Sequence, residues 1–260
     1  MARQGRRGRY PTHSAHQPAV TIRTVQQVLV AAGPRPSQDA SRSDKKNYAE
    51  RFSRHMATCI ANALRRDFPG IKPDELGGDQ ETPARTAKGF KKLDVNYSTP
   101  SLGLALGVSV KSINFSDERT RRFTKNYSRN DNELRAEATD YHQRQPYAVL
   151  VGVLFLPIAS CNDAAQGRNQ ERNISSFGAA AKFFRARANR QVPRDDVDLF
   201  ERFFISLYED TGETLFFDVM RPPPRSRRPH TSECLDFDGF ITEIVRTYNA
   251  RNDPPFHWAQ

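Results

Sequence analysis

The chain has 260 residues, of which 37% are hydrophobic and 27% are charged, and its formal net charge is +10. This length suits one domain of about 200 residues with a tail. No apolar run reaches the roughly 20 residues that span a bilayer, and the basic N-terminus lacks the apolar core of a signal peptide, so we expect a cytoplasmic protein. Three widely spaced cysteines argue against a disulfide framework or a zinc knuckle and suit a reducing compartment.

Positive charge is concentrated near the N-terminus, where residues 1–45 hold eight Lys or Arg and two Asp. The net charge favours a polyanionic partner such as nucleic acid, because neutralised phosphates release their counterions. The simpler alternative is a basic tail on an otherwise ordinary domain. We expect residues 1–42 to form a basic, largely disordered tail and residues 43–260 to form a single domain. An apolar patch in the tail, Ala19–Ala32, predicts a short strand or helix that docks on this domain.

The first clear helix is predicted to begin at Ser43 or Asp44, either of which can cap its N-terminus. Apolar residues at three- and four-residue spacing define its buried face: Tyr48, Phe52, Met56, Cys59, Ile60, Ala63 and Leu64. Glu50 lies outside the centre of that face, and a solvated carboxylate is the usual state of such a residue. Residues 69–92 then read as a polar loop.

Two strands are predicted after this loop, a short one that carries Asp94 and a longer one that ends near Lys111. From Leu102 to Val110 every even-numbered residue is apolar, which is typical of a strand with one buried face. Ser109 and Lys111 are therefore expected to project together from the opposite face.

The rest of the chain alternates between helical and extended patterns. A basic loop interleaved with aromatic residues leads to a helix that begins at Asn130 or Asp131 and runs to about Gln145. The following elements are predicted to be a central strand at Tyr147–Pro157, helices at Ser175–Asn189 and Asp195–Glu209, a strand at Thr214–Met220, and a last helix from Asp236 or Asp238. This order predicts an α/β fold with a mixed central sheet flanked by helices.

Asp94, Lys111 and Glu50 form a set that suits phosphodiester hydrolysis. Hard divalent cations such as Mg²⁺ bind carboxylate and carbonyl oxygens and stabilise charge on the phosphate. A lysine beside the metal can orient or deprotonate the attacking water and can add positive charge at the transition state.

The order of these residues resembles that of the PD-(D/E)xK nuclease superfamily, which has the restriction-endonuclease-like fold. The resemblance covers roughly residues 44–160 and consists of a helix bearing Glu50, then Asp94, then 14 residues, then Ser109-Val110-Lys111. It implies that Asp94 binds the metal, that Lys111 is the catalytic lysine, and that the main-chain carbonyl of Val110 completes the metal shell.

The chain departs from the family pattern at two positions. Leu93 stands where proline is usual, and Ser109, which we count among the catalytic residues, stands where a carboxylate is usual. Some members of the superfamily take this carboxylate from the first helix. The resemblance therefore implies that Glu50 is the second metal ligand, with Glu81 as the other choice.

Further residues are expected to contact DNA. The basic loop provides Phe123, Lys125, Tyr127 and Arg129 for stacking or phosphate contacts. The resemblance implies that the helix after the lysine strand lines the active cleft, and that Asn132, Glu133, Arg135 and Glu137 either contact phosphate or support the residues that bind the metal. The alternative is a solvated loop, and a helix face on which charged pairs contribute a few tenths of a kcal/mol each.

The expected function is that of a Mg²⁺-dependent DNA endonuclease, with Mn²⁺ able to substitute, that acts on double-stranded DNA in restriction or phage defence. Cleavage of both strands would suggest a homodimer. The alternative is a non-catalytic DNA- or RNA-binding protein with a degenerate nuclease fold, and a weaker rival is a structural partner protein whose basic tail binds a larger complex.

Overall fold

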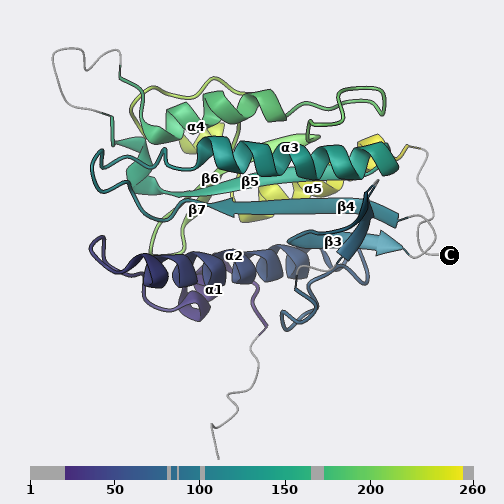
Figure 1. Cartoon of the computed structure of the whole chain (residues 1–260), viewed down its shortest axis with the longest axis horizontal. Coiled ribbons are helices and arrows are strands. Elements are labelled where there is room, and N and C mark those ends of the chain that lie inside the picture. Colours follow the sequence, from purple (N-terminus) through teal and green to yellow (C-terminus); the bar gives the residue numbers. More distant parts are fainter. Residues whose placement is uncertain (1–20, 81–82, 87, 100–102, 165–172, 254–260) are drawn as a thin grey trace, which may run out of the picture.

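A computed structural model describes residues 21–80, 83–86, 88–99, 103–164 and 173–253, and its elements surround one mixed β-sheet (Figure 1). The sheet has five strands in the order β3-β4-β5-β6-β7. These strands span Val95–Thr99 (β3), Gly103–Ser112 (β4), Val149–Pro157 (β5), Arg202–Tyr208 (β6) and Thr214–Asp218 (β7). The predicted α/β class with a mixed sheet flanked by helices is confirmed.

The three central strands β4, β5 and β6 are parallel, and the outer strands β3 and β7 pair antiparallel to their neighbours. Every residue of β5 is buried, which agrees with its predicted place at the centre of the sheet. Because α3 (Tyr127–Arg144) connects β4 to the parallel strand β5, it lies across one face of the sheet.

Two separate hydrophobic cores lie on the two faces of the sheet. One core joins α1 (Val25–Ala32), α2 (Arg42–Leu64) and α5 (Phe237–Arg251) to the sheet. The other joins α3 and α4 (Ser176–Phe184) to the opposite face. Figure 1 shows this division, with α1 and α2 on one side of the strands and α3 and α4 on the other.

The alternating pattern of β4 is interrupted by a bulge. Tyr97 of β3 pairs with Leu106, whereas the next residue, Ser98, pairs with Leu104, so that Ala105 is the extra residue. Leu104 consequently packs in the core under α3, whereas Leu106, Val108 and Val110 pack in the core under α2. From Leu106 onward the predicted alternation is confirmed.

The N-terminal boundary of the domain lies earlier than predicted. Helix α1 is capped by Thr24, and its Val25, Val28 and Ala32 are buried in the core shared with α2. This observation agrees with a docked patch, but it places residues 21–42 in the fold rather than in a tail. The remainder of the predicted tail, residues 1–20, lies outside the described residues.

The predicted helix at Asp195–Glu209 is wrong, because the first half of this segment consists of turns and the second half forms β6. Phe203 and Ile205 pack in one core, whereas Phe204 and Tyr208 pack in the other. A strand that is buried on both faces has a continuous apolar pattern that periodicity alone does not distinguish from a helix. A second difference is a hairpin, β1 (Pro83–Thr86) with β2 (Gly89–Lys92), inside the predicted polar loop.

The remaining helices are close to their predicted positions. The N-cap of helix α2 is Ser41, two residues before the earlier of the two predicted caps, and Asp236 caps α5. Helix α3 begins earlier than predicted, after Asn126. Helix α4 ends at Phe184, and a short 3₁₀ turn, Arg185–Arg187, follows it. None of the helices in the described part of the chain is long and apolar enough to cross a membrane.

Candidate functional site

The candidate site lies near the carboxyl end of β4, on the face that α3 covers. Ser109 and Lys111 both point toward α3, as the alternation predicted, because each contacts a glutamate of that helix. Asp94 lies in the bend immediately before β3, and its Oδ2 accepts a hydrogen bond of 2.7 Å from the backbone N–H of Val110. The antiparallel pairing of β3 with β4 therefore places the Asp94 carboxylate beside the strand that carries Lys111.

Helix α3 adds two carboxylates, one turn apart. The Lys111 ammonium lies 3.5 Å from Oε2 of Glu133 and 3.9 Å from Oε2 of Glu137. The hydroxyl of Ser109 donates a hydrogen bond to Oε1 of Glu137. We call these residues, Asp94, Ser109, Lys111, Glu133 and Glu137, the Lys111 cluster.

The carboxylates keep Lys111 charged in spite of its partial burial. Burial alone would lower the pKa of Lys111, but Glu137, Asp94 and Glu133 raise it by more, so the pKa lies above its ordinary value. The side chain is accordingly an ammonium at neutral pH. In this state it can stabilise developing negative charge, but it does not accept a proton from water.

The surroundings of Glu133, on the exposed side of the cluster, favour the ionised form of its carboxylate. Burial would raise the pKa of Glu133, but hydrogen bonding from Arg129 and the charge of Lys111 lower it below its ordinary value. Tyr141, one turn beyond Glu137, has a raised pKa because of its burial and of the negative charges of Glu137, Asp140 and Asp94. Its phenol therefore remains protonated over the physiological range.

The cluster is closed on the side of Glu137 and open on the side of Glu133. The side chain of Glu137 is 8% exposed and that of Lys111 is 20% exposed, whereas that of Glu133 is 43% exposed. Access from solvent is thus along the exposed face of α3, where Arg129 also contacts Glu133 at 2.8 Å.

The chemistry of the donors fits a hard divalent cation. Asp94 and Glu137 offer carboxylate oxygens, which Mg²⁺ and Mn²⁺ prefer, and three carboxylates face one ammonium in the cluster. Across the described residues, however, no group of three or more His, Cys, Asp or Glu side chains is arranged to hold a metal ion. A role for the Val110 carbonyl as a further ligand stays a prediction.

The structure does not bring Glu50 to this cluster, which corrects its predicted place beside Asp94. Glu50 belongs to α2, which packs on the opposite face of the sheet from Lys111. Its carboxylate is 58% exposed and lies 3.5 Å from Lys46. The other choice for this carboxylate, Glu81, lies outside the described residues. Glu137 occupies the place beside Lys111 instead.

The residues predicted to contact DNA fall into two groups. Lys125, Arg129, Asn132 and Arg135 are exposed. Tyr127 and Glu137 are buried, which corrects the predicted contact of these two side chains with DNA. The Tyr127 hydroxyl donates to the Ser176 carbonyl at 2.8 Å, and its ring packs against Phe183 and Phe184.

The sequence contained one signal for the role of Glu137. Leu134, Ala138 and Tyr141 form the buried stripe of α3, and Glu137 lies within this stripe. Burial of an acid without a cationic partner is costly, so such an acid is not expected at a core position. A carboxylate in such a stripe indicates a cationic partner on the sheet below, which in this fold is Lys111.

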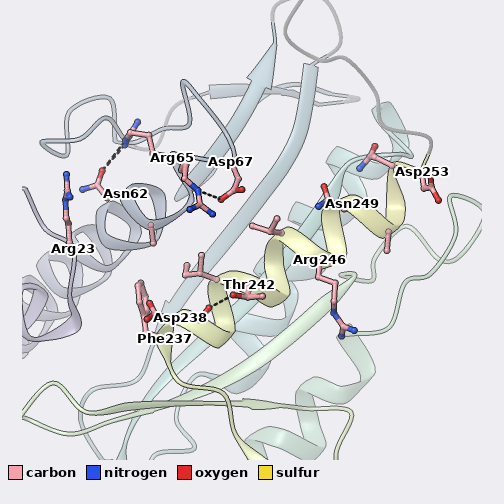
Figure 2. A pocket seen from close by; sticks show the side chains of 16 residues that line it. Arg23, Asn62, Arg65, Asp67, Phe237, Asp238, Thr242, Arg246, Asn249 and Asp253 are labelled. Carbon is pink, nitrogen blue, oxygen red and sulfur yellow. Dashed lines mark hydrogen bonds and ion pairs between the residues drawn. The ribbon is translucent and has the colours of Figure 1, made fainter.

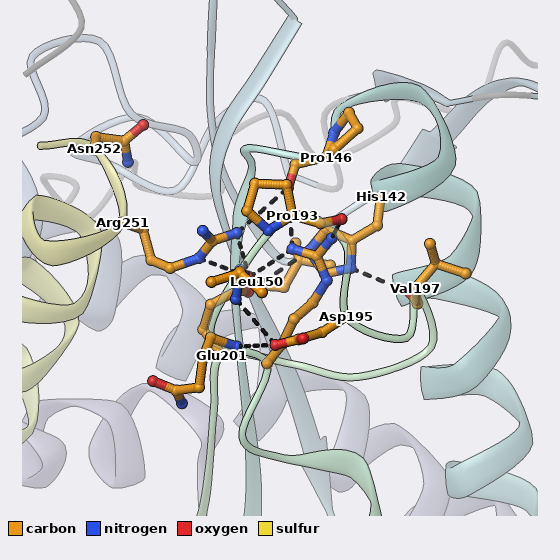
Figure 3. Close-up of polar contacts among 12 residues, drawn as sticks. His142, Pro146, Leu150, Pro193, Asp195, Val197, Glu201, Arg251 and Asn252 are labelled. Carbon is orange, nitrogen blue, oxygen red and sulfur yellow. Dashed lines mark hydrogen bonds and ion pairs between the residues drawn. The ribbon is translucent and has the colours of Figure 1, made fainter.

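A second charged cluster lies at the other end of α3, around Glu201 (Figure 3). Oε2 of Glu201 accepts the Leu150 N–H at 2.7 Å and lies 3.6 Å from Nε2 of His142. Its Oε1 lies 3.2 Å from Arg190 and 3.4 Å from Arg251. We call His142, Arg190, Glu201 and Arg251 the Glu201 cluster. The side chains of His142, Arg190 and Glu201 are fully enclosed, which indicates a structural role.

A groove of about 1580 Å³ lies between the carboxyl end of α2 and helix α5, on the face of the sheet away from Lys111 (Figure 2). Its apolar floor includes Phe237, Ile241 and Val245, and Arg65 and Arg246 line its rim. No titratable side chain of the Lys111 cluster reaches it, so we keep the groove apart from the candidate site.

No protein-family model matches the chain, and no curated protein or solved structure matches it either. The functional assignment therefore depends on the geometry of the Lys111 cluster and on the charge of the surrounding surface.

Proposed function

We propose that this protein is a metal-dependent endodeoxyribonuclease that hydrolyses phosphodiester bonds in double-stranded DNA. The observation that carries the proposal is the contact of the Lys111 ammonium with Glu133 and Glu137 at 3.5 and 3.9 Å, beside the carboxylate of Asp94. A lysine beside carboxylates supports metal-assisted phosphodiester hydrolysis, because the carboxylates can bind a hard cation and the ammonium can stabilise charge on the phosphate.

Each residue of the cluster has a distinct role in this proposal. Asp94 and Glu137 would hold Mg²⁺, or Mn²⁺ in its place, which when bound supplies a Lewis acid for the phosphate and lowers the pKa of water. Lys111 stabilises negative charge on the phosphate as it forms. Ser109 fixes the orientation of the Glu137 carboxylate through its hydrogen bond.

The choice of DNA as substrate is supported by charge. The chain carries a net charge of +10. Lys125, just before α3, and Arg129, in its first turn, are both exposed, and Arg129 contacts Glu133 on the open side of the cluster. A restriction or phage-defence role, a location in the cytoplasm and a homodimer that cuts both strands are further parts of this proposal.

A non-catalytic DNA- or RNA-binding protein is the second candidate. The observation that favours it is that the described residues include no ready group of three metal-ligating side chains. In that case Lys111 and the exposed cations would only bind phosphates, and binding would depend on salt but not on divalent metal.

One experiment separates the two candidates. The wild-type protein and the variants Lys111→Ala and Asp94→Asn are incubated with plasmid DNA in Mg²⁺, in Mn²⁺ or in chelator, together with Lys46→Ala as a control. Lys46 is exposed on the opposite face. We expect metal-dependent cleavage by the wild type and the control, and a loss of about 100- to 1000-fold or more in both site variants, with DNA binding retained. Cleavage that persists in both site variants, or binding without any cleavage by the wild type, would refute the nuclease proposal.

A further inference from the structure

The hairpin formed by β1 and β2 is a strongly basic ribbon. Residues 83–92 include Arg85, Lys88, Lys91 and Lys92 and contain no Asp or Glu. The two strands pair antiparallel from Pro83↔Lys92 to Thr86↔Gly89. Four residues in each strand span about 13 Å at the usual rise of a β-strand.

The hairpin lies directly beside the Lys111 cluster. Its second strand ends at Lys92, two residues before Asp94, so its base is covalently tied to the candidate site. Strand β1 packs against α3 and β4, the two elements that provide the rest of the cluster. The Lys88 ammonium lies 3.3 Å from Asp140, which follows Glu137 by three residues on α3.

A second basic segment lies beyond the other end of the cluster. The connection from β4 into α3 exposes Arg119, Arg121 and Lys125, and it enters the end of α3 that lies away from Asp140. Along α3, the carboxylates of Glu133 and Glu137 are therefore placed between two cationic regions. This order suits a polyanion that extends across the site while one of its phosphates is held at the centre.

We propose that the β1–β2 hairpin binds double-stranded DNA by entering a groove next to the scissile phosphate. The inference rests on the proposed nuclease function and adds the element that holds the duplex. The major groove of B-DNA, about 12 Å wide, admits a two-stranded ribbon. The contact of Lys88 with Asp140 does not oppose this, because an ion pair whose lysine is 76% exposed contributes little and can be exchanged for a phosphate.

The test measures binding of the full chain to a short fluorescent duplex in chelator, by anisotropy, over a range of salt concentrations. The hairpin variant is K88Q/K91Q/K92Q. Its matched control is K46Q/R66Q/R246Q, which removes the same charge from exposed positions of α2, its carboxyl end and α5. We expect the hairpin variant to bind roughly tenfold or more weakly, with a salt slope smaller by up to about 2.7 for three lost phosphate contacts. The control is expected to differ from the wild type far less than the hairpin variant does.

Equal affinity and equal slope in the wild type and the hairpin variant would overturn the inference, and so would an equal loss in the control. Acetylation of the wild-type lysines, read by mass spectrometry, gives a measurement that does not depend on a variant. We expect the duplex to protect Lys88, Lys91 and Lys92 but not Lys46. Unprotected hairpin lysines, or protection by single-stranded RNA alone, would refute duplex binding.

The two proposals fail in different ways. A protein that binds duplex through the hairpin but does not cleave it in Mg²⁺ or Mn²⁺ would refute the nuclease function. A protein whose hairpin variant binds and cleaves as the wild type does would refute only the role of the hairpin.

Discussion

The Lys111 cluster and the Glu201 cluster are both built on α3, yet they differ in enclosure and in balance of charge. In the Glu201 cluster, the side chains of Arg190 and Glu201 are 0% and 1% exposed. In the Lys111 cluster, a path to solvent remains through Glu133. Enclosure without access is typical of a structural network, whereas partial burial with access is typical of a site that binds something.

The two clusters differ in the sign of their net charge: cations outnumber carboxylates in the Glu201 cluster, whereas carboxylates outnumber cations in the Lys111 cluster. Glu201 is one carboxylate between Arg190 and Arg251, and its oxygens are satisfied by them, by His142 and by the Leu150 N–H. Around Lys111, by contrast, three carboxylates face two cations, because Arg129 also contacts Glu133. The excess of negative charge at a partly open site favours the uptake of a further cation, which is what the proposed function requires.

The two clusters also lie at opposite ends of the parallel strands. Lys111 is near the carboxyl end of β4, whereas Glu201 immediately precedes β6 and contacts Leu150 near the amino end of β5. In open α/β sheets, ligands bind outside the carboxyl ends of the strands. The position of the Lys111 cluster agrees with this rule, and that of the Glu201 cluster does not.

The largest effect is expected from Glu201→Gln, because this change leaves two buried arginines without their counter-charge. We expect the free energy of unfolding, measured with urea, to fall by about 3–5 kcal/mol. Cleavage per folded molecule should be unchanged, because Glu201 lies at the far end of α3. A stable variant with impaired cleavage would show that the Glu201 cluster is not structural.

Glu137→Gln makes the same chemical change in the Lys111 cluster, where we expect a small effect on stability and a large effect on cleavage. The isosteric amide can still accept the hydrogen bond from Ser109, so the free energy of unfolding should change by no more than about 1 kcal/mol. The cleavage rate in Mg²⁺ should fall about 100- to 1000-fold, which corresponds to roughly 2.7–4 kcal/mol. If Glu137→Gln instead lost much of its stability and cleaved DNA normally, Glu137 would contribute to folding and not to cleavage.

The pH dependence of stability tests the electrostatic environment of Glu201. Burial would raise the pKa of Glu201, but His142, the Leu150 N–H and Arg251 lower it by more, so the folded-state pKa lies below its ordinary value. Such a group contributes its stability fully above the unfolded pKa of about 4.3, and the contribution is lost as the pH falls through the folded pKa.

We therefore expect the gap in unfolding free energy between the wild type and Glu201→Gln to be constant from pH 7 to about 5. Below about pH 4 the gap should narrow by up to about 1.4 kcal/mol per pH unit. Urea titrations of both proteins across this range measure it. A gap that stays constant down to pH 3 would contradict a lowered pKa for Glu201.

The sequence allowed the strand half of the candidate site to be predicted. For the helix half, the resemblance placed Glu133 and Glu137 along the cleft but assigned the second metal ligand to Glu50. The alternation in β4 placed Ser109 and Lys111 on one face, and the structure confirms that placement. Periodicity gives the two faces of a strand without saying which helix covers each of them. Glu50 and Glu137 lie on helices that precede and follow β4 in the chain, and the packing of α2 and α3 on opposite faces of the sheet separates them.

The same limit explains the error at β6. Phe200, Phe203, Phe204 and Leu207 have the spacing of a helical stripe. That spacing arises here because the sheet has a core on each face, so both sides of the strand are apolar. The burial of a strand on two faces is a property of the whole fold, and local sequence does not encode it.

The smallest effect is expected from Glu50→Gln, which tests directly whether Glu137, rather than Glu50, is the second carboxylate of the site. Glu50 is exposed on α2 and interacts with Lys46 as an i,i+4 pair, so its loss should cost about 0.3–0.5 kcal/mol in unfolding free energy. Cleavage should equal that of the wild type, whereas Glu137→Gln, which makes the same chemical change, should reduce it. If instead Glu50→Gln abolished cleavage and Glu137→Gln did not, the second carboxylate would come from α2, and the cluster on α3 would have to be assigned to phosphate binding or to folding.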